Sequence, residues 1–294
     1  DQVTIEIPAL KLKKTFPVLH KQIPVHFILP SFQPWSPEAP FCYLVIIRNA
    51  SDRLEEKIGF RTIETRGREV LLNGKRIFMR GIDIHEEIPQ QGRRAYSRED
   101  ALQLLGWARE LGCNMVRLAH YPHDESMTRL ADSLGVLVWS EIPVYWTIDF
   151  SNKEVLENAE GQLHEMITRD HNRASIIIWS VGNETPVYAA RTRFMKSLVD
   201  SARAMDPTRL LSAALEVNYH EGQQTHTVDD PLGAYLDLIS FNEYLGWYGG
   251  TPASCRTASW GTKYDKPLFI SETGAGALGG FHGDSLTMWS EEYQ

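Results

Sequence analysis

The sequence predicts an α/β protein in which a (β/α)8 barrel follows a small β-sandwich. Three observations support this prediction. Two continuous apolar runs, at 175–181 and 267–270, are followed by the carboxylates Glu184 and Glu272. Strand and helix patterns alternate from about residue 65 onward. Before that point, short strand patterns are separated by proline-rich segments without helical periodicity, which is typical of a sandwich.

Residues 1–64 carry the sandwich pattern. Alternating or apolar strand patterns occupy 3–7, 25–29 and 41–47, and the turns between them contain prolines at positions 30, 34, 37 and 40. Two or three further strands would fit the same segment. It is therefore expected to be a seven-stranded unit, either complete or without its first strand.

The rest of the chain, 65–294, carries the barrel pattern. Seven strands are predicted, at 76–85, 114–119, 136–141, 175–181, 210–215, 238–244 and 267–272. Four helices are predicted, at 98–111, 124–134, 156–170 and 191–205. Ser97 to Asp100 has the pattern of a capping box before the first helix, and Gly112 and Gly135 follow the first two helices. Seven strand–helix units with short connections indicate a barrel.

A doubly wound open sheet is the alternative architecture. Against it, no glycine-rich dinucleotide loop follows the first strand. An eighth strand is not recognisable, because only residues 273–294 follow Glu272. An open barrel would expose a long apolar edge, so we expect the barrel to be truncated before strand eight.

Composition excludes several classes of function. The net charge is −8 without a block of lysine or arginine, so nucleic-acid binding has no electrostatic support. No apolar run has the length of a membrane span. Cys42, Cys113 and Cys255 are odd in number and far apart, which indicates incidental thiols rather than a disulfide frame or a zinc site. The start shows no signal-peptide pattern, and the compartment stays open between cytoplasmic and periplasmic or secreted.

Polar side chains follow nearly every predicted strand, at the end where barrels place their catalytic groups. They are Asp83, His85, Glu86, Arg117, His120, Tyr121, Glu141, Asn183, Glu184, Asn242, Glu243, Tyr244 and Glu272. One such glutamate alone would more often be a solvated loop residue. Two glutamates after different strands are what a glycosidase needs, one as proton donor and one as nucleophile or base.

Several motifs resemble glycoside hydrolase family 2, the family of β-galactosidases, β-glucuronidases and β-mannosidases. The family's acid/base motif matches Asn183-Glu184, and its nucleophile motif matches Ser271-Glu272. Further matches lie at 80–86, 114–122, 242–248, 34–40 and 58–61, and the last two are similar to an immunoglobulin-like domain before the barrel. The segments 280–284 and 291–294 are most similar to the β-glucuronidase branch. The resemblance implies a TIM barrel over 65–294 and an immunoglobulin-like β-sandwich over 1–64.

The resemblance also implies a reaction, namely retaining hydrolysis of a terminal β-linked sugar. Glu272 would be the nucleophile and Glu184 the acid/base. Arg117 and Tyr244 would favour the ionised nucleophile, and Asn183 would contact the sugar 2-hydroxyl. The remaining candidates for substrate binding or support are His85, His120, Asp83, Trp247 and His282. This interpretation needs a carbohydrate substrate and neither a cofactor nor a metal, nucleic-acid or membrane partner, and it leaves a homo-oligomer open.

The sequence departs from the family pattern at two places. Thr273 follows the nucleophile, where Tyr or Phe is common. The Asn-x-Lys pair by which β-glucuronidases hold the sugar carboxylate has one match, Asn73-Gly74-Lys75, which reads as a turn before the first barrel strand. The sugar is therefore open between β-glucuronidase-like, β-galactosidase-like and other β-glycosidase activities.

Two rival functions belong to other classes. A metal hydrolase is disfavoured, because no His-x-His or His-x-x-x-His pair lies where it could form a ligand set. An inactive carbohydrate-binding fragment would carry both glutamates without a competent site. Binding of an aryl glycoside without turnover would separate that fragment from an enzyme.

Overall fold

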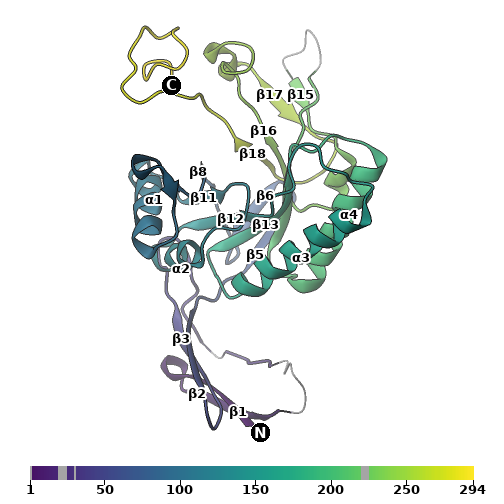
Figure 1. The fold of residues 1–294 in the computed structure, drawn as a ribbon. Coiled ribbons are helices and arrows are strands. Elements are labelled where there is room, and N and C mark those ends of the chain that lie inside the picture. Colours follow the sequence, from purple (N-terminus) through teal and green to yellow (C-terminus); the bar gives the residue numbers. More distant parts are fainter. Residues whose placement is uncertain (1, 19–24, 30, 220–224) are drawn as a thin grey trace.

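The computed structural model describes residues 2–18, 25–29, 31–219 and 225–294. Its centre is a seven-stranded sheet in which every neighbouring pair is parallel, in the order β18-β16-β14-β13-β12-β11-β8 (Figure 1). The strands are β8 (Gly81–Ile84), β11 (Met115–Leu118), β12 (Leu137–Glu141), β13 (Ile176–Asn183), β14 (Leu210–Leu215), β16 (Ile239–Asn242) and β18 (Leu268–Glu272). The seven predicted strands are thus confirmed, with boundaries shifted by a few residues.

The residues that the structure describes form four α-helices, which cover the sheet in two pairs, α1 with α2 and α3 with α4 (Figure 1). They are α1 (Arg98–Glu110), α2 (Glu125–Leu134), α3 (Lys153–Asp170) and α4 (Ala189–Met205). The predicted capping box is present, because Ser97 and Asp100 exchange side-chain to backbone hydrogen bonds. Helix α3 begins earlier than predicted, since the side chain of Asn152 accepts a hydrogen bond from the N–H of Glu154 and caps the helix.

The prediction of seven complete strand–helix units is wrong for the two units after β14 and β16. The first connection contains β15 (Thr225–Thr227) and the 3-10 helix η3 (Pro231–Ala234), and the second contains η4 (Pro252–Arg256) and β17 (Ser259–Gly261). Strands β15 and β17 pair with each other. Both 3-10 helices begin with proline, which suits a first helical turn, and neither is extended by an apolar stripe with helical spacing.

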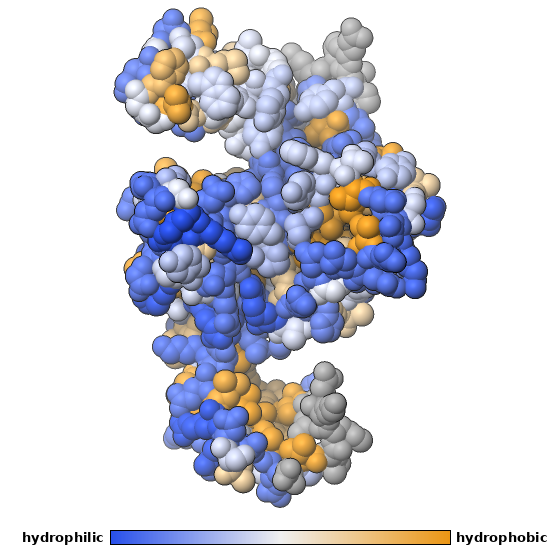
Figure 2. All heavy atoms as spheres, in the orientation of Figure 1, coloured by the Kyte–Doolittle hydropathy of each residue, from blue (hydrophilic) through white to orange (hydrophobic). Residues whose placement is uncertain are grey.

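The N-terminal part forms one antiparallel sheet in the order β2-β1-β3-β4. Its elements are β1 (Gln2–Ile7), η1 (Pro8–Leu10), β2 (Leu12–Pro17), β3 (Tyr43–Arg48) and β4 (Arg53–Ile58). The strand predicted at 25–29 is wrong, because this segment lies outside regular secondary structure. Figure 2 shows apolar side chains gathered on the surface of this lobe. A second layer that would complete a sandwich is not present among the described residues of this lobe.

Short elements join the two lobes and lead into the first helix. A three-stranded sheet is formed by β5 (Ile63–Arg66), β6 (Glu69–Leu72) and β7 (Lys75–Arg76). After β8, the chain forms β9 (Glu87–Ile88), η2 (Pro89–Gln91) and β10 (Arg93–Arg94). Strands β9 and β10 pair as a small antiparallel ribbon before Ser97 begins α1.

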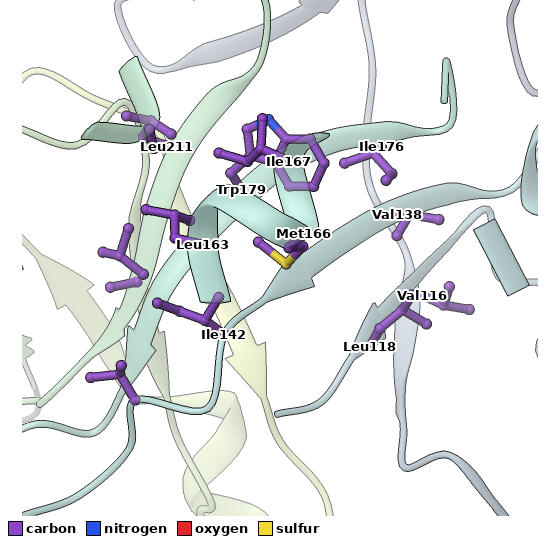
Figure 3. Close-up of a cluster of buried hydrophobic side chains, with 14 of the residues drawn as sticks. Val116, Leu118, Val138, Ile142, Leu163, Met166, Ile167, Ile176, Trp179 and Leu211 are labelled. Carbon is purple, nitrogen blue, oxygen red and sulfur yellow. The ribbon is translucent and has the colours of Figure 1, made fainter. Parts of the chain in front are cut away.

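The five inner strands of the main sheet, β11, β12, β13, β14 and β16, are buried on both faces, whereas the edge strands β8 and β18 are partly exposed. One face packs against the helices, where Val138, Ile176 and Trp179 lie beside Leu163 and Met166 of α3 (Figure 3). The alternate strand residues point to the inside of the curved sheet and form a second cluster with Trp35, Val70 and Leu72. That inner cluster fills the barrel below the carboxyl ends of the strands.

The segment before the barrel closes its lower end. The indole Nε1 of Trp35 donates to the carbonyl of Asp132 at 2.8 Å, and Trp35 is fully buried. Arg61 donates to the carbonyl oxygens of Ala174 and Ile176 at 3.1 and 2.6 Å. Apolar packing and these hydrogen bonds shut one end of the barrel, so the carboxyl ends of the strands are the end that can admit a ligand.

Substitution Gly135→Ala should destabilise this junction. Gly135 ends α2 with φ of 73°, and an added Cβ would lie 2.3 Å from the carbonyl oxygen of Pro37. Left-handed backbone and a backbone clash together should lower the free energy of unfolding by roughly 2–4 kcal/mol. Denaturant titration would measure the change.

Gly161→Ala is the matched control, since Gly161 lies inside α3 and an added Cβ meets nothing within 4 Å. That substitution should raise the free energy of unfolding by about 0.5–1 kcal/mol. Equal stabilities for Gly135→Ala and wild type would contradict the assigned close packing of Gly135 on Pro37.

Candidate active site

A buried guanidinium, that of Arg117 on β11, lies at the centre of the polar cluster. Its Nη2 donates to Oε1 of Glu141 and to Oδ1 of Asn183, each at 2.9 Å. Its Nη1 lies 3.5 Å from Oδ2 of Asp83 and also donates to Oε1 of Glu272. Only 3% of Arg117 is exposed. One side chain on β11 thus joins groups from four other strands at the carboxyl end of the barrel.

The position of Arg117 follows from the alternation of its strand. Val116 and Leu118 point toward the helices, so Arg117 between them points into the barrel. In the sheet register it is paired with Asp83 of β8 and Trp139 of β12. Burial by itself would lower the pKa of Arg117, but the surrounding carboxylates raise this pKa above its usual value. The guanidinium is therefore permanently charged.

Glu272, the last residue of β18, lies between two hydrogen-bond donors. Its Oε1 accepts from Arg117 and its Oε2 accepts from the phenol of Tyr244. Burial, together with the hydrogen bond to Glu272, raises the pKa of Tyr244 above its usual value, so this phenol keeps its proton and donates it. The side chain of Glu272 is 12% exposed. Two donors, one of them cationic, thus hold both oxygens of this carboxylate in place.

Glu184 follows β13 and has different surroundings. Its backbone is left-handed, with φ of 48°, and its N–H donates to the carbonyl of Ala214 at 2.8 Å. For a residue other than glycine this conformation costs about 1–3 kcal/mol and occurs preferentially at functional sites. Its Oε2 accepts one hydrogen bond, from the indole Nε1 of Trp146 at 3.1 Å. The described part of the chain places no cation in hydrogen-bonding contact with this carboxyl group.

A cavity of about 730 Å³ opens beside Glu184. Its lining includes Tyr219, His226, Asn242, Glu243, Tyr244 and Tyr248. The phenol of Tyr244 that lines this cavity is the one that donates to Glu272. Tyr244 thus lines the cavity beside Glu184 and contacts Glu272, so the two glutamates singled out from the sequence lie at the same cleft.

Asn183 is held in one orientation by its neighbours. Its Oδ1 accepts from Arg117 and from Nδ2 of Asn242, the latter at 3.1 Å. Asn242 is itself oriented by Ser271, whose hydroxyl donates to its Oδ1 at 2.8 Å. No residue that the structure describes accepts a hydrogen bond from Nδ2 of Asn183. This amide is thus positioned to donate to a ligand beside Glu184.

His120 and Glu141 form the inner wall of the cluster. Nδ1 of His120 lies 2.6 Å from Oε1 of Glu141, and its Nε2 lies 3.7 Å from Oε1 of Glu272. Burial would lower the pKa of His120, but the bond to Glu141 raises it overall. Burial would raise the pKa of Glu141, but Arg117 and His120 lower it overall. His120 is thereby favoured as a cation close to both carboxylates.

Asp83 and His85 complete the cluster on the side of β8. Burial raises the pKa of the Asp83 carboxyl to about 7, against the opposing charge of Arg117. The ring of His85 meets the ring of His120 edge-on, with centroids 5.6 Å apart. The structure therefore brings together eight of the ten residues proposed from the sequence, namely Asp83, His85, Arg117, His120, Asn183, Glu184, Tyr244 and Glu272.

The other two, Trp247 and His282, contact residues of the C-terminal segment, which extends away from the barrel (Figure 1). The ring of Trp247 packs edge-on against Trp289, with centroids 4.8 Å apart. Nδ1 of His282 lies 2.9 Å from Glu292, and its side chain is 64% exposed. Neither makes a contact with Glu184 or Glu272 within the described ranges. Their role in the pocket stays a prediction.

Sequence reasoning missed Trp146 and gave Glu141 no role. Glu141 was noted as a carboxylate at a strand end, but nothing in the sequence showed that it pairs with Arg117. Trp146 lies in the loop after β12, outside any motif. Its contact with Glu184 depends on how that loop packs on β13.

Two further findings concern metals and membranes. Among the residues described, no group of three or more His, Cys, Asp or Glu side chains is arranged to hold a metal ion. None of the described helices combines the length and the apolar character that crossing a membrane requires.

Comparison with known proteins places this geometry in a family. Residues 63–294 match the family model described as glycosyl hydrolases family 2, TIM barrel domain. A β-glucuronidase of Rattus norvegicus is 31% identical over 260 residues, which are 84% of this chain and 38% of that protein. A β-glucuronidase of Paenibacillus borealis is 28% identical over 289 residues, covering 88% of this chain and 46% of that protein.

A solved structure shows the same arrangement in space. The GH2 β-galacturonidase of Eisenbergiella tayi, bound to galacturonate, superposes with a TM-score of 0.81 at 29% identity. That match covers 100% of this chain and 54% of the other. The chain thus spans about half the length, or less, of the relatives that it matches. By its matched barrel and its sequence, the chain belongs to glycosyl hydrolase family 2.

Proposed function

We propose that the protein is a retaining exo-β-glycosidase of the β-glucuronidase type, which hydrolyses a terminal β-linked sugar through a glycosyl-enzyme intermediate. The observation that carries this proposal is the contrast between the two carboxylates. Glu272 has a cation and a phenol as donors, which suits an ionised nucleophile. Glu184 has one neutral donor and faces the cavity, which suits a group that holds and transfers a proton.

In the first step, Glu272 attacks the anomeric carbon and Glu184 protonates the departing glycosidic oxygen. Arg117 and Tyr244 orient the attacking carboxylate by holding one oxygen each. In the second step, Glu184 removes a proton from water, and this water breaks the bond between the sugar and Glu272. Retention requires the two carboxyl groups to lie about 5 Å apart. Nδ2 of Asn183 is proposed to hydrogen-bond the sugar 2-hydroxyl in both steps.

The choice of sugar rests on the named relatives. Two are β-glucuronidases and one is a β-galacturonidase, and the sugars in these names are both hexuronic acids. A terminal β-linked hexuronic acid, with glucuronic acid first, is therefore the proposed substrate. A β-galactosidase would belong to the same reaction class. It would prefer a sugar without the carboxylate.

The division of the chain is also proposed. Residues 1–64 would form an immunoglobulin-like domain and residues 65–294 the catalytic barrel. The antiparallel sheet β2-β1-β3-β4 supports the first assignment, and the parallel sheet supports the second. The role of the N-terminal domain would be to support the closed lower end of the barrel.

Alanine substitutions should separate the roles of the two glutamates. Glu272→Ala removes the atom that bonds to the sugar, so hydrolysis of any β-glycoside should fall by several orders of magnitude. Glu184→Ala removes proton transfer, which contributes roughly 10²–10⁴-fold. A nitrophenyl glycoside should still form the glycosyl-enzyme, because its leaving group departs without a proton. Mass spectrometry of the protein after mixing would detect the sugar on Glu272.

Added azide gives the stereochemical control. With Glu184→Ala it should restore turnover and give a β-glycosyl azide, since it replaces the base-activated water. With Glu272→Ala it should attack directly and give the inverted product. The inverted product from Glu184→Ala would show that the two roles are reversed. Binding of the aryl glycoside to wild type without turnover would identify a carbohydrate-binding module instead of an enzyme.

The raised pKa of Asp83 predicts a pH dependence of stability. In the unfolded chain an aspartate releases its proton near pH 4, whereas Asp83 in the folded chain holds its proton up to about 7. Between these values the unfolded state binds fewer protons, so the contribution of Asp83 to the free energy of unfolding falls as pH rises, and it levels off above pH 7.

Asp83→Asn should remove this contribution, because the amide does not titrate. The stability of the variant relative to wild type should therefore increase from pH 4.5 to pH 8, as measured by denaturant titration at both values. Glu64→Gln is a control, since Glu64 is an exposed carboxylate on β5 outside the cluster. A constant difference between Asp83→Asn and wild type would contradict the raised pKa.

A further inference from the structure

The loop after β12 is fixed to the end of β13 by backbone hydrogen bonds. The N–H of Trp146 donates to the carbonyl of Asn183 at 3.0 Å, and the N–H of Asn183 donates to the carbonyl of Val144 at 2.9 Å. Tyr145 forms an isolated parallel bridge with Asn183. Trp146 itself has a left-handed backbone, with φ of 53°. The tryptophan is thus tied to the residue that directly precedes Glu184.

The side chain of Trp146 turns from this anchor to the carboxyl group of Glu184. Its Nε1–H donates to Oε2 at 3.1 Å. The indole N–H is a donor only, so the oxygen that it contacts must act as acceptor. The carbonyl oxygen is the stronger acceptor of a carboxylic acid, so this contact favours the proton of a neutral Glu184 on Oε1 rather than on Oε2. Because the indole N–H does not titrate, it can orient the carboxyl group in both protonation states and favour one oxygen for delivery of the proton.

The ring of Trp146 is also accessible to a ligand, because 63% of the residue is exposed. With Leu215, Val217 and Tyr219 it lines a cavity of about 300 Å³ that also contains Glu184. An acid/base must lie within hydrogen-bonding reach of the glycosidic oxygen. The group attached to that oxygen must then lie close to Glu184, in the cavity that Trp146 also lines.

We propose that Trp146 is a positioning residue for the acid/base Glu184 and that its ring forms the wall of the leaving-group site. This inference rests on the proposed function, in which Glu184 protonates the glycosidic oxygen. The leaving groups that fit such a wall are flat and apolar, because an aromatic face stacks on them with little loss of hydration.

Two substitutions separate the N–H from the ring. Trp146→Phe keeps an aromatic face and removes the donor. For phenyl β-glucuronide, whose leaving group needs a proton, kcat/KM should fall roughly tenfold, the size expected for one hydrogen bond to an ionisable group. For 4-nitrophenyl β-glucuronide the same variant should stay within about twofold of wild type, because that leaving group departs without the proton.

Trp146→Ala removes the ring as well. It should show the same loss from the missing donor and, in addition, raise KM for phenyl β-glucuronide by about fivefold relative to methyl β-glucuronide, the size of one aromatic contact. Trp107→Phe is the matched control, since Trp107 packs on the core from α1, outside the site. It should change neither the ratio of kcat/KM between the phenyl and nitrophenyl substrates nor the ratio of KM between the phenyl and methyl substrates. Equal slowing of phenyl and nitrophenyl substrates by Trp146→Phe would reduce Trp146 to a structural role and overturn the proposal.

A spectroscopic measurement tests the contact independently of activity. The indole N–H resonance that disappears in Trp146→Phe identifies Trp146 in the nitrogen–proton NMR spectrum. It should move in Glu184→Gln, which weakens the acceptor, and stay in place in Glu243→Gln. The latter is a matched control, because Glu243 accepts the indole N–H of Trp260 at 2.9 Å.

The outcomes distinguish this inference from the proposed function. If wild type hydrolyses no β-glycoside, the proposed function fails. The resonance then still decides whether Trp146 holds Glu184. If the resonance does not respond to Glu184→Gln, the positioning role is refuted even in an active enzyme.

Discussion

The arrangement of carboxylates at the carboxyl ends of the barrel strands depends on the charge of one guanidinium, that of Arg117. Arg117 is buried beside Glu141, which is fully buried, and it also contacts Glu272 and Asp83. Without this cation, carboxylates would lie close together in a poorly solvated space, where an unpaired charge is costly. The hydrogen bonds of Arg117 also require five strands to keep one register. The carboxylates are therefore neutralised only when the strands of the sheet are in their correct register.

The same cation explains why two chemically identical side chains can act differently. Arg117 donates directly to Glu272, whereas the one hydrogen bond that the described residues give the carboxyl group of Glu184 comes from the neutral indole of Trp146. Because the backbone of Glu184 is left-handed, its side chain does not follow the alternation of side chains between the two faces of the strand. The neighbouring Asn183 then stays in the guanidinium network, while Glu184 faces the cavity. One step along the chain thus separates a group held by the cation from a group left free to exchange a proton.

Much of this arrangement could be predicted from the sequence, for physical reasons. β13 is buried on both faces and needs a continuous apolar run, and a polar residue after such a run marks the strand end, so Glu184 was recognisable. The apolar run of β18 marked Glu272 in the same way, although Leu268 and Ile270 are partly exposed in this edge strand. The capping box at Ser97 is equally local. The connection after β14 was not predictable, because η3 is stabilised from afar by Nζ of Lys266, which donates to the carbonyls of Gly233, Ala234 and Leu236. The contact of Trp146 with Glu184 could not be predicted for the same reason, because the packing of a loop produces no periodic pattern in the sequence.

The contacts of Arg117 with both edge strands of the sheet have a further consequence, which concerns the order of folding. β8 and β18 are the two outer strands of the sheet, and Arg117 contacts Asp83 on one and Glu272 on the other. Arg117 and Glu272 are 155 residues apart in the chain, so this contact has a high cost in loop closure. The proposed nucleophile acquires its counterion only when the sheet has curved enough to bring its outer strands together. A folding intermediate with its helices and inner strands formed, but with a sheet that has not yet curved, would therefore be compact and still lack catalytic activity.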